Sequence, residues 1–258
     1  MDKYTTTKTI SNKNEKIPNT VGRRGEIDRS PQEFGNKYKN VLKKQNSVIR
    51  SRFDLATLNA RSLKSQESLL ELENALKSIN WDIIGLSEVR RSEEKIEEHE
   101  DYIFYYKNIS AGLYGVGFMV KKYLKNEILE FIGVSDRIAI LNIKLPGHKQ
   151  PISVVQVYAP TNIAKEEVKN NFYKKLNEVI PNLHKTIIVI GDFNGQLGKR
   201  RSNEDKILGL YSSGKRNDNG QRLINFGLEN NLKIMNTYSK KPNRKWTWIS
   251  EWSDEKRN

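Results

Sequence analysis

The segment VIGDFNGQLG, residues 189–198, decides the fold class of this chain. Apolar residues typical of a buried strand lead into Gly191, and Asp192 and Asn194 follow. Residues two apart in an extended segment point to the same side, so a carboxylate and an amide face one place. A turn alone would also explain GDFNG, because Gly, Asp and Asn favour turns. The segment therefore predicts either a turn or a strand that ends at a functional site.

Three other apolar segments end in a polar residue in the same way. They read as buried strands, and they are FDLATLNAR (53–61), WDIIGLSEV (81–89) and PISVVQVYAP (151–160). Their final polar residues are Asn59, Glu88 and Tyr158. Each has an ordinary role of its own, namely a cap, an ion pair with Arg90 or Arg91, and a core aromatic. The repetition of the pattern predicts a site where strand ends meet.

Helices and further strands fill the rest of the chain. Apolar residues recur at helical spacing within 62–80, 165–181 and 219–232. Further strands are expected in the segments 100–108, 115–122, 128–145, 186–194, 233–240 and 244–251. Because the strands follow a mixed order with only some helical crossovers, we predict an α/β sandwich.

The 258 residues suffice for one large domain or two small ones. Residues 1–50 are polar and rich in Lys, Asn and Thr, so they bury too little apolar surface to offset the entropy of ordering. We therefore expect a basic, disordered leader over 1–50 and a globular domain over 51–258.

The net charge of +14 predicts a polyanionic partner. Residues 1–50 and 196–258 each carry a net charge of +7, and the stretch between them is neutral. Nucleic acid is favoured over a membrane surface, and a lysine-rich surface that binds nothing is the alternative. The chain has no cysteine, which excludes disulfides and thiolate metal sites. It also lacks a membrane-length apolar run and a signal-peptide pattern, so we expect a nuclear or cytoplasmic protein that is not secreted.

Six motifs in order resemble the endonuclease/exonuclease/phosphatase superfamily. They are LNARSL (58–63), DIIGLSEVR (82–90), VYAPT (157–161), GDFNGQLG (191–198), NDNGQRLINFGLENNLKIMNTY (217–238) and KWTW (245–248). Within the superfamily, the chain looks like the apurinic-type endonuclease domain of non-LTR retrotransposons and the craniofacial development protein 2-like proteins. The resemblance covers roughly 51–258. It implies a four-layer α/β sandwich of two β-sheets flanked by helices, with a Mg²⁺- or Mn²⁺-dependent phosphodiesterase site at one edge.

The resemblance also implies roles for the strand-end residues. Glu88 would be the metal ligand, and Asn59 would be its neighbour in the metal shell. Tyr158 would contact the scissile phosphate. Asp192 would orient or deprotonate the attacking water, and Asn194 would bind a phosphate oxygen.

Three further residues are candidates for substrate binding by the same resemblance. Thr247, in KWTW, matches a position near the substrate backbone. Arg137 and Asn219 are weaker matches, because an ordinary strand-end charge and a turn or helix-cap residue explain them as well. The basic segments 198–206 and 239–248 are expected to hold the DNA backbone.

The chain departs from the family pattern near its end. Family members continue past the WTW strand into a segment like IDY-I-L and a final serine–aspartate–histidine motif. Here the sequence ends with DEKRN, and none of His99, His148 and His184 lies in a matching motif. We therefore expect a domain whose last strands are missing, with weak or no nuclease activity.

The sequence leaves three functions open. The first is a metal-dependent endonuclease that nicks DNA, as part of a larger reverse-transcriptase polyprotein. The second is a vestigial, non-catalytic nucleic-acid-binding protein that uses the same surface. A phosphatase of small phosphoesters is disfavoured by the basic ends and by the motif match.

Overall fold

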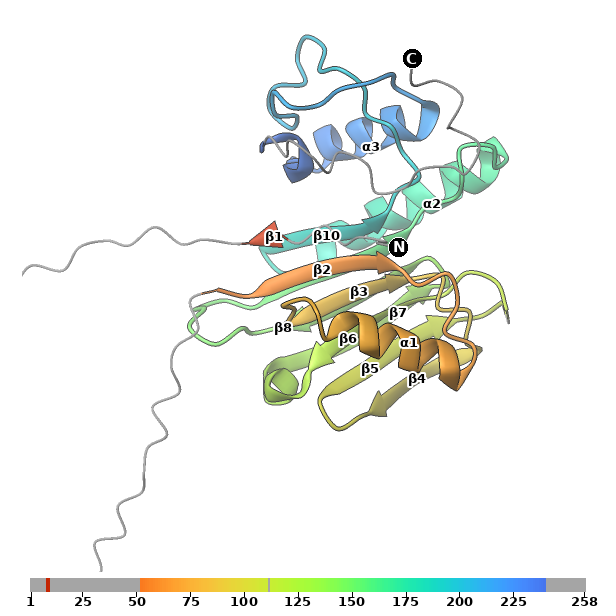
Figure 1. Ribbon diagram of the computed structural model, residues 1–258. Helices are drawn as coiled ribbons and strands as arrows, with labels where there is room; N and C mark the ends of the chain where they lie inside the picture. The colour runs from red at the N-terminus through yellow and green to blue at the C-terminus, as the bar shows by residue number, and fades with distance from the viewer. Residues whose placement is uncertain (1–7, 10–51, 111, 240–258) are drawn as a thin grey trace, which may run out of the picture.

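The computed structural model describes residues 8–9, 52–110 and 112–239 (Figure 1). The rest of the expected leader, the expected strand at 244–251 and the substrate candidate Thr247 lie outside the described residues. Within the described ranges, no helix combines the length and the apolar character needed to cross a membrane.

The first β-sheet has six strands, and only β2 and β3 pair in parallel. In spatial order the strands are β1 (Lys8–Thr9), β2 (Asp54–Asn59), β3 (Ile83–Ser87), β6 (Val116–Lys121), β5 (Tyr102–Asn108) and β4 (Glu93–Glu98). The register of the parallel pair sets Asn59 opposite Ser87. Both strands therefore end at the same edge of the sheet.

The second β-sheet has four strands, with one parallel pair at its end. Its order is β10 (Thr186–Asp192), β9 (Ile152–Tyr158), β8 (Ile138–Ile143) and β7 (Ile128–Ser135). Asp192 lies opposite Tyr158 in the parallel register, so these two residues also share one edge. Short 3₁₀ segments lie in the connections: η1 (Lys122–Glu127), η2 (Ile180–Asn182) and η3 (Met235–Thr237).

The two sheets pack face to face, and helices cover their outer faces (Figure 1). Buried apolar residues of both sheets, among them Phe118 and Val154, form the central core. Helix α1 (Gln66–Leu76) packs Leu69 and its neighbours on the first sheet. Helices α2 (Glu166–Val179) and α3 (Asp218–Glu229) cover the second sheet with residues that include Phe172 and Phe226. This arrangement confirms the predicted α/β fold with two mixed sheets and flanking helices.

Strand β1 lies within the leader that the sequence predicts to be disordered, and there it pairs with β2. Two further elements differ from the sequence prediction. Strand β4 was not expected, because its sequence EEKIEE is almost wholly exposed and shows no apolar alternation. The prediction of a strand over 233–240 is wrong. The described part of this segment forms η3, and its only β-type pairing is the isolated bridge between Ile234 and Leu208. The hydroxyl of Thr237 donates to the Ile234 carbonyl (2.6 Å) and accepts from Gly209 N (2.7 Å). These local hydrogen bonds hold a turn in place of a strand.

A long connection joins β10 to α3, and Arg216 holds it in place. The guanidinium uses all five of its N–H groups. It donates to both oxygens of Glu204 (2.6 and 2.8 Å), to Gln221 Oε1 (2.9 Å), and to the carbonyls of Leu197 (2.7 Å) and Lys199 (3.2 Å). The arginine side chain is 5% exposed, so this ion pair lies inside the connection.

The sheets approach each other closely at Gly85 of β3. The fully buried Gln156 of β9 faces it, and its Oε1 accepts from Thr57 Oγ1 of β2 at 3.1 Å. A Cβ atom at residue 85 would lie 2.0 Å from Gln156 Oε1 and 2.7 Å from Ile190 Cδ1. Glycine is therefore needed for this buried amide to link the two sheets.

We expect Gly85→Ala to lower the free energy of unfolding by roughly 1–3 kcal/mol, because the added methyl group overpacks the space between the sheets. Urea unfolding followed by circular dichroism measures the change. In a Gln156→Ala background the same substitution should cost clearly less, since the main clash is gone. An equal cost in both backgrounds would contradict a clash with this amide.

Candidate active site

The candidate site lies at the carboxyl ends of β2, β3, β9 and β10. In Figure 1 the arrowheads of β2, β3 and β10 point to the same end of the molecule. Side chains alternate along a strand, so Leu55 and Ile190, which face the central core, put Asn59 and Asp192 on the inner faces as well. Tyr158 packs against the same core. The pattern that fills the core therefore also directs these polar side chains between the two sheets.

Asn59 brings together carboxylates from both sides of the sandwich. Its Nδ2 donates to Glu88 Oε1 at 2.6 Å and to Asp192 Oδ2 at 3.3 Å. Its Oδ1 accepts from the backbone N–H of Arg61 at 3.0 Å. Because that N–H can only donate, it fixes which end of the amide faces the carboxylates. Asn59 thus offers a donor that two carboxylates share.

Glu88 follows the last residue of β3 and leaves the strand alternation. Its φ is +56°, a left-handed conformation that is costly for residues other than glycine. Simple alternation would turn Glu88 away from the core, and this conformation instead directs it toward Asn59. Val89 anchors the segment, since it is fully buried and its N–H donates to the Gly115 carbonyl at 3.2 Å. Backbone strain at this point therefore places the carboxylate in the site.

The Glu88 carboxylate is surrounded by donors. Burial alone would raise the pKa of Glu88, but hydrogen bonds from Asn59, Arg90 and Tyr158 outweigh it and hold the pKa below its usual value. The Arg90 contact is 2.7 Å to Oε2, and the Tyr158 hydroxyl lies 3.1 Å from Oε1. Burial and the negative charge of Glu88 raise the pKa of Tyr158 to about 12. At neutral pH the pair is thus a carboxylate and a neutral phenol.

Asp192 and Asn194 form a compact unit at the end of β10. The Asn194 N–H donates to Asp192 Oδ1 at 3.0 Å, and Asn194 Nδ2 donates to the Ala159 carbonyl at 2.9 Å. Asn194 is also left-handed, with φ +48°. Gly191 has φ +138°, and a Cβ there would lie 2.0 Å from the Val157 carbonyl oxygen. GDFN is therefore a strand end, and only glycine fits at its first position.

Arg137, one of the weaker candidates from the sequence, lies beside Tyr158. It donates to the Tyr158 carbonyl at 3.1 Å, and its guanidinium carbon lies 5.1 Å from the Tyr158 ring centroid. The same guanidinium lies 4.0 Å from the ring centroid of Tyr114. Sequence reasoning missed Tyr114, which comes from the connection between β5 and β6. No spacing signal links that connection to the strand ends.

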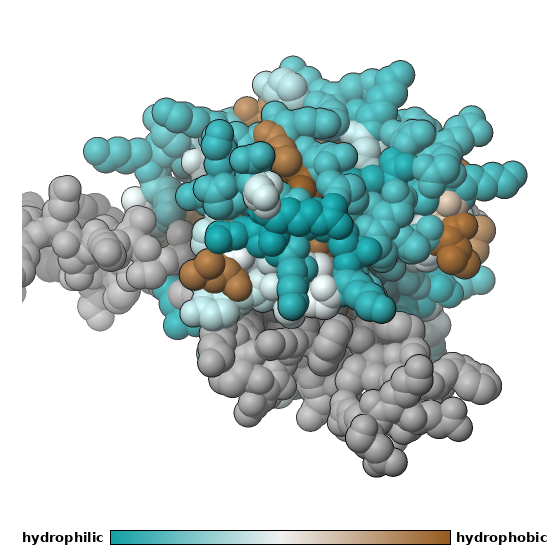
Figure 2. All heavy atoms as spheres, turned by 90° about the horizontal axis from the view of Figure 1, so that it is seen from above, coloured by the Kyte–Doolittle hydropathy of each residue, from teal (hydrophilic) through white to brown (hydrophobic). Residues whose placement is uncertain are grey.

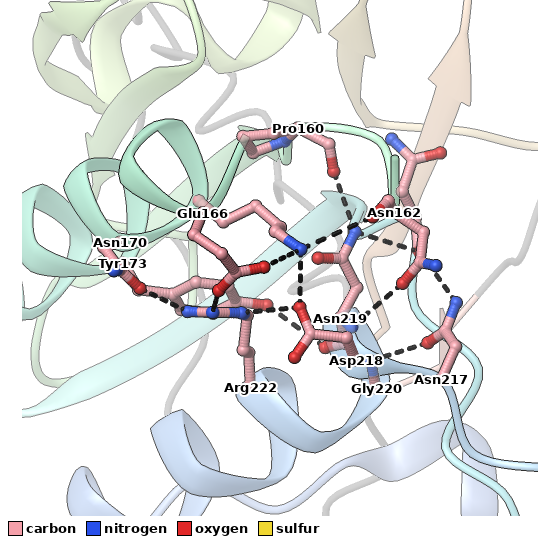
Figure 3. Close-up of polar contacts among 12 residues, drawn as sticks. Pro160, Asn162, Glu166, Asn170, Tyr173, Asn217, Asp218, Asn219, Gly220 and Arg222 are labelled. Carbon is pink, nitrogen blue, oxygen red and sulfur yellow. Dashed lines mark hydrogen bonds and ion pairs between the residues drawn. The ribbon is translucent and has the colours of Figure 1, made fainter. Parts of the chain in front are cut away.

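Asn219 is buried at the start of α3, and Figure 3 shows its side chain extending toward Pro160. Its side chain is buried, and Nδ2 donates to the carbonyls of Pro160 (2.8 Å) and Asn194 (3.2 Å). The helix cap is Asn217, whose Oδ1 accepts from the N–H groups of Gly220 and Gln196, both at 2.8 Å. The first turn of α3 thus supports the two connections that follow β9 and β10.

An ion-pair cluster fixes that first turn against α2 (Figure 3). The ammonium group of Lys169, whose side chain is only 4% exposed, contacts Glu166 at 2.5 Å and Asp218 at 2.7 Å. Arg222 contacts both carboxylates as well, at 2.9 Å for Asp218. Because four charged groups alternate in sign, each is compensated at this helix contact. The support behind Asn194 is therefore tied to the helical layer.

The donor set of the site fits Mg²⁺ or a similar cation. Glu88 and Asp192 offer two carboxylates within reach of one amide, and Mg²⁺ commonly takes one or two carboxylates and keeps several waters. Over the described ranges there is no group of three or more His, Cys, Asp and Glu residues that could hold a metal ion. The arrangement thus suits a cation that is shared with water and substrate, rather than one enclosed by protein ligands.

None of the three histidines lies beside Asp192. His99 stacks on Tyr102 with ring centroids 4.4 Å apart, and His148 packs on Phe53 at 6.0 Å. His184 donates its backbone N–H to Ser153, near the opposite end of β9. Since the chain has three histidines, no imidazole contributes to the site as described.

The chain is similar to two curated mammalian proteins. It is 31% identical over 201 residues to craniofacial development protein 2 of Bos taurus, in a match that covers 76% of this chain and 33% of the relative. The match to the same protein of Tragulus javanicus is also 31% identical and covers 34% of that relative. The chain thus spans about a third of the length of these relatives.

Solved structures give matches at lower identity. The 3′ phosphatase NExo from Neisseria aligns with a TM-score of 0.47 and 15% identity, over 67% of this chain and 69% of the other. The endonuclease domain of TRAS1, a telomere-specific non-LTR retrotransposon, aligns with a TM-score of 0.44 and 13% identity, over 69% and 70%.

The family model that describes the Endonuclease/Exonuclease/phosphatase family matches residues 55–254. This match includes every strand end of the site, and it confirms the resemblance that GDFNG and its companion motifs predicted. The chain belongs to the Endonuclease/Exonuclease/phosphatase family.

Proposed function

We propose that this chain is a divalent-metal-dependent phosphodiesterase that nicks DNA, of the type found in retroelement endonucleases. The observation that supports it is the meeting of Glu88, Asp192 and Tyr158 around the Asn59 amide, at one edge of two packed sheets. Two carboxylates, a neutral phenol and several amides suit a phosphate ester, whose oxygens need positive charge and hydrogen-bond donors.

Each residue has a chemical task in this proposal. Glu88 would hold Mg²⁺ or Mn²⁺, with Asp192 nearby, and a bound cation supplies charge neutralisation for the phosphate. Tyr158 would donate a hydrogen bond from its hydroxyl to a phosphoryl oxygen. Asp192, held by the Asn194 N–H and by Asn59, would orient the attacking water and accept its proton. Asn194 uses Nδ2 toward the Ala159 carbonyl, which leaves one N–H of the amide for phosphate.

A basic surface beside α3 supports nucleic acid as the substrate. The connection from β10 to α3 carries five exposed basic residues, namely Lys199, Arg200, Arg201, Lys206 and Lys215. Figure 2 shows that this face is mostly hydrophilic, with only scattered apolar side chains. Arg216 anchors the connection from inside, so the exposed charges sit on an ordered scaffold. Such charges would contact phosphates without reading sequence.

A second candidate is a protein that binds nucleic acid without cutting it. The observation that favours it is that none of the histidines lies near Asp192, so the site as described has no imidazole to share a proton. Loss of one member of a concerted site commonly costs on the order of 10³-fold in rate. Cleavage separates this candidate from the first, whereas both predict binding. Membership of a reverse-transcriptase polyprotein stays a prediction.

We expect Glu88→Ala and Asp192→Ala each to lower Mg²⁺-dependent nicking of supercoiled plasmid by about 100-fold or more, because they remove charge that the reaction uses. The matched control is Glu130→Ala, which removes an exposed carboxylate of β7. This variant should nick plasmid as fast as the parent protein. EDTA should abolish the activity. Nicking that neither site variant reduces would refute the endonuclease proposal, and binding without any nicking would favour the second candidate.

We predict that Asn219→Ala lowers kcat by about 10-fold while KM changes little, because the substitution loosens Asn194 without touching substrate. Steady-state cleavage of a short duplex measures both constants. Asn225→Ala, at an exposed position of the same helix, is the control. Thermal unfolding of both variants checks that they fold. A rise in KM alone would instead assign Asn219 to substrate binding.

We expect the triple replacement of Lys199, Arg200 and Arg201 by Gln to weaken the salt dependence of DNA binding. The magnitude of the slope of log affinity against log salt concentration should fall by about 2–3, because about one counterion is released for each phosphate contact. Fluorescence anisotropy over a salt series measures the slope. The control replaces Lys174, Lys175 and Lys185, which are equally exposed and carry the same charge. Equal slopes in the two triple variants would show that the connection is not the binding surface.

A further inference from the structure

Arg90 lies beside Glu88 and leaves most of its side-chain donors without a protein acceptor in the described residues. Among the described residues, its side chain makes one hydrogen bond, from a terminal nitrogen to Glu88 Oε2 at 2.7 Å. Its Nε is buried and has no hydrogen-bond partner within the same ranges. Arg216, by contrast, uses all five N–H groups on protein acceptors. An arginine whose role is to stabilise the fold is expected to use its donors on protein acceptors, as Arg216 does. Most of the side-chain donors of Arg90 are not used in this way.

The Arg90 guanidinium occupies the side of Glu88 that a cation would use. Oε1 of Glu88 already accepts from Asn59 and Tyr158, so Oε2 is the oxygen left for a ligand. Arg90 covers Oε2 with a full positive charge. A divalent cation that approaches Oε2 is repelled by the guanidinium, because both are positively charged. The cation and Arg90 therefore compete for this oxygen.

The backbone confines any rearrangement to the Arg90 side chain. The Arg90 N–H donates to the Tyr114 carbonyl at 2.9 Å, and the residue is left-handed, with φ +57°. Val89, directly before it, is fully buried. The side chain itself is 40% exposed, so its guanidinium can turn from Glu88 toward solvent while the backbone stays in place.

We propose that Arg90 holds the place of the metal ion at Glu88, competes with the divalent cation for this carboxylate, and turns to a nucleic-acid phosphate once the cation displaces it. This inference rests on the proposed metal-dependent function. Its consequence is a coupling between two ligands: phosphate that engages Arg90 removes a competitor of the cation, and by linkage the cation strengthens the contact of Arg90 with phosphate.

Mn²⁺ titration of the purified full chain without nucleic acid, followed by the EPR signal of free Mn²⁺, tests the competition. We expect Arg90→Gln to lower the Kd for Mn²⁺ by roughly three- to fivefold, because the competing charge is gone. Arg90→Lys keeps a charge and should restore much of the parent value. Arg61→Gln removes one charge from an exposed residue two positions after Asn59 and controls for general electrostatics.

The outcomes separate this inference from the proposed function. Glu88→Gln should abolish the Mn²⁺ site, and a parent chain without Glu88-dependent binding would overturn both. Glu88-dependent binding that is equal or weaker in Arg90→Gln, or that tightens equally in Arg61→Gln, would overturn only the role of Arg90. Thermal unfolding without metal verifies that each variant folds.

A DNA titration tests the second half of the proposal. In an Asp192→Asn background, which limits cleavage, Arg90→Gln should weaken duplex binding severalfold with Mn²⁺ and hardly at all without it. Without the cation, the Arg90 guanidinium stays on Glu88. Its removal by Arg90→Gln should therefore change the affinity for DNA little. The same loss of affinity with and without Mn²⁺ would refute the hand-over from carboxylate to phosphate.

Discussion

The amide of Asn59 is the contact on which the candidate site depends. Two carboxylates, one following β3 and one ending β10, approach the same nitrogen from different sheets. Two carboxylates that share one donor repel each other, and the amide N–H groups of Asn59 offset part of that repulsion. The sheets themselves are kept close by Gly85 and the buried amide of Gln156. The chemistry of the edge is therefore a consequence of how tightly the interior packs.

The side chains of the site are oriented both by strained backbone conformations and by contacts with residues outside the site. Glu88, Arg90 and Asn194 all adopt left-handed conformations, which persist only where surrounding structure holds them. Buried Val89 holds the first two residues, and Asn219 holds the third through the Asn194 carbonyl. The ion pairs of Lys169 then fix the start of α3 to α2. The position of Asn194 thus depends on residues of α2 and α3 that lie outside the candidate site.

The convergence of the strand-end residues could be predicted because it follows from alternation along buried strands. Apolar periodicity alone places Asn59, Tyr158 and Asp192 on the inner faces of the sheets. Other features had no such signal. Glu88 breaks the alternation through its φ angle, and Tyr114 reaches the site from a connection between strands. The exposed strand β4 lacks the periodicity that marks a buried strand, and local hydrogen bonds of Thr237 override the apolar pattern after α3.

The acidic strand β4 also bears on self-association. It ends its sheet, and an edge strand offers free backbone groups to any other strand of suitable shape. Its sequence EEKIEE has glutamates at both ends. If a second copy paired with it in antiparallel fashion, Glu93 would oppose Glu98 and Glu94 would oppose Glu97, and such like-charge pairs are unfavourable. The order of charges along this short strand therefore disfavours edge-to-edge pairing of two molecules through β4, and with it aggregation by that route.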